Sequence, residues 1–216
     1  MMRLAALILI AGGLLIAGGL AGCALSPSQF GGNGLGMTEP ATDTGRSGLG
    51  VTTATQPADG AGHAVAVDSS GKAPKGALAD RDYSQTKLDP QRALQLINDY
   101  RASKGLAALK LDARLTVAAK TQSRDLASSD RISHYGSDGS SPWDRVKRAG
   151  YNARIAAENV GTGQASLDEV FKGWTESPGH NRNLLLPGAH DMGIALVEDS
   201  KTEFKTFWTL VVASSQ

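Results

Sequence analysis

The hydrophobic positions between residues 88 and 185 recur at the spacing of amphipathic helices. The first predicted helix follows Asp89, an N-cap residue that precedes a proline, and it ends near Gly105. A second helix is predicted from Asp112 to the polar run at 128–130. Its small apolar residues indicate close packing against a sheet or another helix.

Three further helix starts follow along the chain. Ser141 precedes an acidic residue by three positions, and Ser166 does the same, so each predicts a capping box. The third start is at Ser177, whose hydroxyl is suited to cap the helix, with Pro178 at the first helical position. This spacing places His180 at about the third position of the new helix.

The last part of the chain has the pattern of two strands. Residues 192–197 are apolar, 198–203 form a polar turn, and 204–212 are rich in aromatic and β-branched residues. This pattern predicts an antiparallel hairpin. Helices come first and strands later, without regular βαβ alternation, so the sequence predicts an α+β fold.

The N-terminal 22 residues have the pattern of a secretory signal peptide: Arg3, then a short apolar run, then small residues before Cys23. The ending Leu20-Ala21-Gly22-Cys23 resembles a bacterial lipobox. That resemblance implies that Cys23 is lipidated, becomes the mature N-terminus and anchors the protein to a membrane. The alternative is an ordinary signal peptide followed by a chance cysteine.

Residues 23–84 are rich in Gly, Ala, Ser, Thr, Asp and Pro and lack a sustained apolar period. Such a composition predicts a flexible linker, in which His63 is an inert, solvated side chain. The folded domain is then expected over residues 85–216.

Composition narrows the range of partners. The formal net charge is +1 and the basic residues are not concentrated in a patch, so nothing indicates nucleic acid as a partner. The single cysteine excludes an internal disulfide and a Cys-rich zinc site. The sequence gives no indication of the oligomeric state.

Three residues are candidates for chemistry. His134 lies in a loop dense in Gly, Ser and Asp, where it either packs or functions. Glu158 lies in an apolar run, and a buried acid needs a partner, so we expect a histidine, an arginine or a metal beside it. His180 is expected to stay neutral in the positive field of its helix start, free to bind a metal or accept a proton; alternatively it only caps its helix. His190 is expected at the surface.

Three motifs, in this order, resemble the bacterial branch of the CAP superfamily, which includes the cysteine-rich secretory proteins: Ser133-His134, residues 157–160 and residues 173–185. The resemblance implies a three-layer α-β-α sandwich with a central antiparallel sheet. It also implies a cleft with two histidines and two acids, matched here by His134, His180 and Glu158. Glu176 is the nearest candidate for the second acid. The disulfides of the eukaryotic members are missing.

The resemblance and the residues leave three function classes open. The preferred one is a binding module in the bacterial cell envelope, whose cleft holds a lipid, sterol, peptide or wall fragment. The second is a metal-dependent hydrolase with Glu158 as general base, although the chain has neither a Gly-x-Ser-x-Gly elbow nor a His-Glu-x-x-His helix. The third is a structural envelope protein.

Zinc or another divalent metal is the expected cofactor, with His134 and His180 as ligands and water filling an open site. The alternative is a hydrogen-bonded cluster in which carboxylates orient the histidines without metal.

Overall fold

The structure is a computed structural model, and it describes residues 51–53 and 63–216 of the chain. The predicted signal peptide and Cys23 lie outside the described residues. Within those two ranges, no helix is long and apolar enough to cross a membrane.

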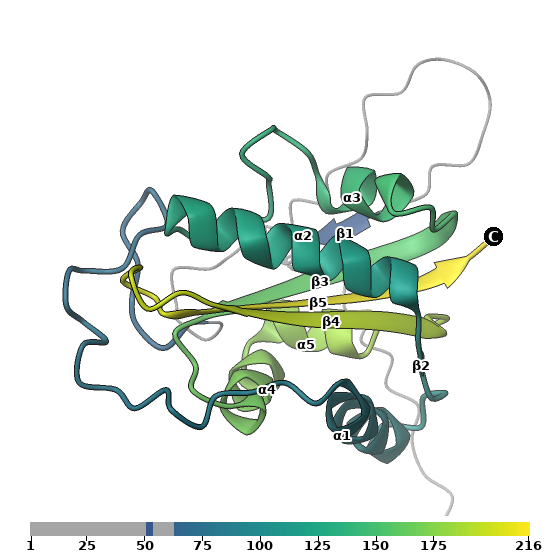
Figure 1. Cartoon of the computed structure of the whole chain (residues 1–216). Coiled ribbons are helices and arrows are strands. Elements are labelled where there is room, and N and C mark those ends of the chain that lie inside the picture. Colours follow the sequence, from purple (N-terminus) through teal and green to yellow (C-terminus); the bar gives the residue numbers. More distant parts are fainter. Residues whose placement is uncertain (1–50, 54–62) are drawn as a thin grey trace, which may run out of the picture. The chain divides into compact units, whose positions relative to one another are not determined.

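Five helices and five strands make up the described fold (Figure 1). The helices are α1 (Pro90–Ser103), α2 (Ala113–Ser129), α3 (Pro142–Arg148), α4 (Leu167–Glu176) and α5 (Pro178–Leu184). The strands are β1 (Val51–Thr53), β2 (Lys110–Leu111), β3 (Ala153–Thr162), β4 (Asp191–Glu198) and β5 (Thr206–Ser215).

These strands form one sheet in the order β1-β3-β5-β4-β2. The three long strands in the middle are antiparallel, and the predicted hairpin is confirmed as β4 and β5. The short edge strands β1 and β2 instead run parallel to β3 and β4. The sheet is therefore antiparallel at its centre and mixed at its edges.

Helices cover both faces of the sheet, which confirms the predicted three-layer sandwich (Figure 1). Side chains on β5 alternate between the faces, as the pleat of a strand requires. Leu210 and Val212 pack in the cluster with α1, α4 and α5, whereas Val211 and Ala213 pack in the cluster with α2 and α3. The core thus lies in two layers, one on each side of the central strands.

Local signals in the sequence account for most helix starts. Asp89 and Asp112 accept hydrogen bonds from first-turn backbone N–H groups, and Ser141 forms the complete capping box with Asp144. Ser177 is at the N-cap of α5, but its side chain makes no capping hydrogen bond. The prediction of a capping hydroxyl at Ser177 is therefore wrong, and the rigid proline that follows it is the remaining local signal for this start.

Residues 63–84 pack on the domain, although their composition predicts a flexible linker. Leu78 is 3% exposed and belongs to a core cluster with Val160, Phe204 and Phe207. The hydroxyl of Tyr83 donates to the carbonyl of Gly163 at 2.9 Å. The predicted boundary at residues 84/85 is thus too late for the packed region, because scattered contacts with distant residues, not a local apolar period, hold this segment.

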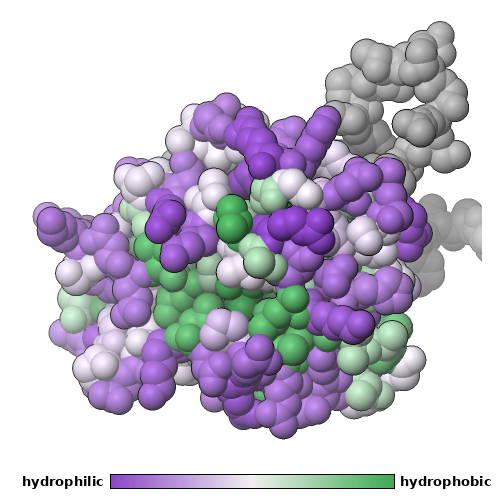
Figure 2. All heavy atoms as spheres, turned by 45° about the vertical axis from the view of Figure 1, so that its right-hand side comes forward, coloured by the Kyte–Doolittle hydropathy of each residue, from purple (hydrophilic) through white to green (hydrophobic). Residues whose placement is uncertain are grey.

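The surface is not evenly polar. Figure 2 shows one face on which hydrophobic residues gather in a central area that hydrophilic residues border. Among the described residues, the large apolar side chains with high exposure are Val117 at 55% and Tyr135 at 39%. Most large apolar side chains elsewhere in the described part belong to the two-layer core.

Candidate functional site

Three separate elements bring the predicted site residues to β3. His134 lies in the loop between α2 and α3, Glu158 lies in β3, and His180 is the third residue of α5. The side chain of His134 is 10% exposed and that of Glu158 is 1% exposed, and His180 as a residue is also 1% exposed. The fold therefore places all three predicted residues away from bulk water.

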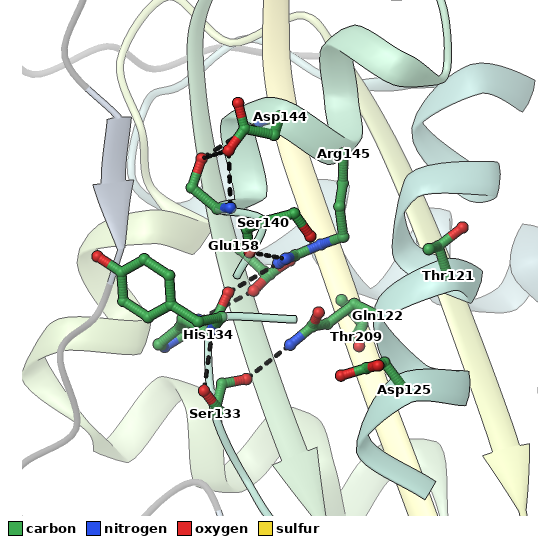
Figure 3. A network of polar contacts seen from close by, with 12 residues as sticks. Thr121, Gln122, Asp125, Ser133, His134, Ser140, Asp144, Arg145, Glu158 and Thr209 are labelled. Carbon is green, nitrogen blue, oxygen red and sulfur yellow. Dashed lines mark hydrogen bonds and ion pairs between the residues drawn. The ribbon is translucent and has the colours of Figure 1, made fainter. Parts of the chain in front are cut away.

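Glu158 is shared between two partners (Figure 3). One carboxylate oxygen, Oε1, lies 3.0 Å from Nδ1 of His134, and the other, Oε2, accepts from Nη2 of Arg145 at 2.8 Å. The arginine side chain is itself only 2% exposed. The expectation of a partner for the buried acid is confirmed, with both a histidine and an arginine in that role.

Arg145 also organises the loop that carries His134. Its guanidinium donates to the backbone carbonyl of His134 at 2.9 Å and to that of Ser140 at 2.8 Å. From the other side, the side-chain amide of Gln122 donates to the carbonyl of Ser133 at 2.7 Å (Figure 3). A glycine- and serine-rich loop is thus fixed at both ends, which holds the imidazole against Glu158.

This arrangement sets the tautomer of His134. The carboxylate of Glu158 is paired with Arg145, so it accepts a hydrogen bond from Nδ1–H of the imidazole. The lone pair of His134 is then on Nε2, which is buried and has no hydrogen-bond partner within the described structure. In this cluster the group available to take a proton or bind a cation is Nε2 of His134, since both oxygens of Glu158 are engaged.

His180 lies in a different environment. Neither of its ring nitrogens has a hydrogen-bond partner within the described structure. Burial, together with smaller contributions from the nearby charges of His134 and His63, lowers the pKa of His180 to about 3. The expected neutral imidazole is thus supported, with burial as the main cause in place of the helix dipole.

Two asparagines tie α5 to β3. The side-chain amide of Asn159 donates to the carbonyl of His180 at 3.0 Å. That of Asn183 donates to the carbonyl of Glu158 at 3.0 Å and to the side-chain oxygen of Asn159 at 2.9 Å. Buried amides with satisfied hydrogen bonds position His180 relative to the strand that carries the acid.

His63 reaches the same region from the segment before the domain. It is 8% exposed, and its Nδ1 lies 3.1 Å from the hydroxyl of Thr162 at the end of β3. Its charge contributes to the lowered pKa of His180. The expectation of an inert, solvated His63 is therefore wrong, because a pairing with β3 far along the chain buries it.

The remaining candidates lie elsewhere. Glu176 is the last residue of α4, where its side chain is 58% exposed and its carboxylate pairs with Lys172. The structure does not bring it into the network around Glu158. His190 is exposed, as expected.

A metal fits this donor set poorly. No group of three or more His, Cys, Asp or Glu side chains that can hold a metal ion occurs among residues 51–53 and 63–216. The two predicted ligands, His134 and His180, supply at most two protein donors, because Glu158 is committed to His134 and Arg145. Catalytic zinc sites ordinarily have three protein ligands.

A small pocket of about 140 Å³ lies beside α3, lined by Trp143, Tyr151, Gln216 and their neighbours. None of the predicted site residues lines it. The polar cluster around β3 therefore remains the candidate site.

The sequence patterns do not identify three residues of the site region individually: Arg145, Asn183 and His63. The one signal for Arg145 is that a buried Glu158 needs a partner. That signal predicts an arginine as one possible partner but does not say which one. Asn183 lies within the resemblance motif at 173–185, whereas nothing in the sequence around His63 marks it.

Comparisons with known proteins agree with this fold. The model of the cysteine-rich secretory protein family, CAP, matches residues 94–212. The uncharacterized protein YkwD of Bacillus subtilis is 31% identical over 119 residues, which are 55% of this chain and 44% of YkwD.

Two solved structures share the fold at lower identity. An extracellular protein with an SCP domain from Bacillus anthracis has a TM-score of 0.52 and 22% identity, covering 61% of this chain and 45% of that one. An outer surface protein from Borrelia burgdorferi has a TM-score of 0.52 and 20% identity, covering 60% of this chain and 98% of that one.

This chain thus spans less than half the length of YkwD and of the Bacillus anthracis protein. The similarity concerns the domain from α1 to β5, in which the family match includes His134, Glu158 and His180. The chain belongs to the cysteine-rich secretory protein (CAP) family.

Proposed function

We propose that this chain is a binding module of the bacterial cell envelope, in which the cluster of His134, Glu158 and His180 receives a polar group of a small ligand. The observation that carries the proposal is a set of three buried ring nitrogens without a hydrogen-bond partner among the described residues: Nε2 of His134 and both nitrogens of His180. Buried polar atoms are ordinarily hydrogen-bonded, and each exception in a native structure calls for an explanation. A bound ligand group supplies one here.

The chemistry of the cluster limits what the ligand presents. Nε2 of His134 accepts a hydrogen bond, and a neutral His180 both donates and accepts one. A hydroxyl or an amide of a lipid, sterol, peptide or wall fragment matches this combination. The buried pair of Glu158 and Arg145 keeps the acceptor role of His134 fixed.

The hydrolase alternative, with Glu158 as general base, has less support. A general base needs a carboxylate oxygen within reach of water or substrate. Both oxygens of Glu158 are engaged and its side chain is 1% exposed. We therefore prefer binding to hydrolysis with Glu158 as the base.

The test compares ligand binding by the full chain and its His180→Ala variant. Native mass spectrometry would probe four compounds: palmitate, a sterol, a tetrapeptide and a muramyl dipeptide. We expect one class to bind the parent and to lose about tenfold or more in affinity in the variant, as for loss of one or two buried hydrogen bonds. His190→Ala, at an exposed histidine, is the matched control and should bind like the parent.

Equal binding by the parent and His180→Ala would contradict the proposed role of the cluster. A variant that loses only stability, with no ligand from any class bound to the parent, would favour the structural alternative.

A divalent metal is a separate proposal. Zinc held by His134 and His180 would need water or the ligand as its other donors, because these histidines supply only two protein ligands. Calorimetric titration of zinc into the full chain tests this directly. Zinc binding that is equally strong in His180→Ala would rule out this histidine as a ligand.

The location in the envelope is proposed from the sequence signals and the relatives. The lipobox-like ending at Cys23 supports a lipid anchor, and two structural relatives are described as an extracellular and an outer surface protein. We expect a Cys23→Ser variant to move from the membrane fraction to the soluble fraction and to lose labelling by a palmitate analogue. Retention in the membrane without that label would contradict anchoring through Cys23.

A further inference from the structure

The edge of β3 that faces away from β5 is paired with a short segment of the same chain. Val51–Thr53 pairs in parallel with Ala156–Glu158. Farther along, His63 forms a bridge with Thr162, and the backbone N–H of Ala64 donates to the carbonyl of Thr162 at 2.9 Å. These are the two places at which the described residues pair with this edge.

This pairing runs directly beside the candidate site. Thr53 is opposite Glu158 in the register, and His63 is opposite Thr162. The charge of His63 acts on His180, so the segment is within electrostatic reach of the cluster. An extended chain on this edge of β3 therefore passes the acid that orients His134.

The two parts of the segment differ in how firmly they are held. Downstream, Leu78 and Ala64 press against Gly163, where an added Cβ would come within 2.7 Å of the leucine side chain and 2.9 Å of that of Ala64. Upstream, the strand pairing extends over three residues in parallel orientation. Short parallel pairing contributes little stability, so this part of the segment is suited to exchange.

We propose that this edge of β3 is a strand-addition site for an extended peptide, and that Val51–Thr53 is its resident occupant. A strand edge presents a row of backbone N–H and C=O groups, and peptides commonly bind proteins by adding a strand there. The chain's own β1 demonstrates that the edge accepts a parallel strand. The inference rests on the proposed binding function and names its ligand class as an extended peptide.

The test weakens the resident strand in the full chain and measures peptide binding. Thr52→Pro removes a backbone N–H in the middle of β1, whereas the matched control Thr52→Ala retains it. The probe is a fluorescent synthetic peptide with the sequence of residues 48–58, followed by anisotropy. We expect the proline variant to bind it about tenfold more tightly than the parent or the alanine variant, because a tethered strand competes at high effective concentration.

A second probe examines the mode of binding. The same peptide with N-methyl groups at alternate residues lacks the ladder donors on one side and should bind the Thr52→Pro variant at least about tenfold more weakly. Equal affinity for the two peptides, or no gain in the proline variant, would overturn the inference. Circular dichroism verifies the fold, and Val51→Pro, at the start of the strand, provides a second variant for the same comparison.

Failure of this inference is distinguishable from failure of the proposed function. Peptide binding that is sensitive to N-methylation but unchanged by His180→Ala would support strand addition and contradict the role of the histidine cluster. A small ligand that depends on His180, together with no peptide binding by Thr52→Pro, would support the cluster and overturn strand addition.

Discussion

The two histidines at the site have opposite surroundings. The ring of His134 is held by Glu158, and its loop is held by Arg145 and Gln122. His180 is more deeply buried, at 1% exposed, yet neither of its ring nitrogens has a hydrogen-bond partner in the described structure. One histidine is therefore oriented by the protein alone, and the other is positioned through its backbone.

This difference indicates that the contacts around His134 support the fold, whereas His180 is suited to contact a ligand. The buried ion pair of Glu158 and Arg145 stabilises one geometry of the loop that carries His134, so its removal should chiefly affect folding. An unpartnered imidazole costs stability in the free protein, and a ligand that satisfies it recovers that cost. The following variants test this division, from the largest expected effect to the smallest.

Arg145→Met should have the largest effect. It leaves the buried carboxylate of Glu158 without its cation, and breaking a buried ion pair in this way costs about 3–5 kcal/mol. Urea unfolding of the full chain measures the loss. Arg148→Met is the control, because its pair with Asp138 is largely exposed and should matter little. Similar midpoints for the two variants would contradict a supporting role for Arg145.

Acid should destabilise the protein through His180. Its pKa is about 3 in the folded state and about 6.5 when unfolded, so the unfolded state binds more protons between these values. Stability is then full above about pH 6.5 and falls as the pH decreases toward 3, by up to a few kcal/mol.

Urea unfolding at pH 7, 6, 5 and 4 measures this slope. His180→Asn should flatten it, and the matched variant His190→Asn should leave it unchanged, since His190 is exposed. An identical slope in the parent and His180→Asn would mean that other groups cause the acid sensitivity.

The serine N-caps of α3 and α5 should respond differently to alanine. Ser141 forms a complete capping box with Asp144, so Ser141→Ala should cost about 1 kcal/mol. The Ser177 hydroxyl is buried without a partner in the described structure, so Ser177→Ala should be close to neutral. Thermal unfolding compares them. A larger loss for Ser177 would indicate that its hydroxyl has a role in the site.

Glu176→Gln should have the smallest effect. Its carboxylate is paired with Lys172 at an exposed position, so we expect ligand affinity to change by less than about twofold. The measurement is the same native mass spectrometry that tests His180. A loss comparable to that of His180→Ala would place Glu176 in the cleft, as the family resemblance implies.

Much of the fold could be predicted from the sequence because its signals are local. Asp89, Asp112 and Ser141 start helices where capping chemistry predicts, and the last two strands follow from their apolar pattern. The run that contains Glu158 was harder to assign, since its polar residues interrupt a strand that is buried over most of its length. The layers themselves came from the family resemblance.

The sequence names candidate site residues, but it does not predict most of their contacts. Buried charges are ordinarily paired, so Glu158 was expected to have a partner. Which arginine pairs with it depends on how α3 packs against β3. His63 could not be found in this way. Its burial depends on pairing with Thr162, 99 residues away in the sequence, and no local pattern reports such a contact.

The packing of Leu78 determines where this protein can be shortened. A chain that began at residue 85 would uncover the apolar bed formed by Val160, Phe204 and Phe207. It would also lack His63 beside the cluster. The isolated domain would then expose apolar surface and have an altered site. Ligand-binding measurements should therefore use a chain that begins upstream of His63 and includes β1.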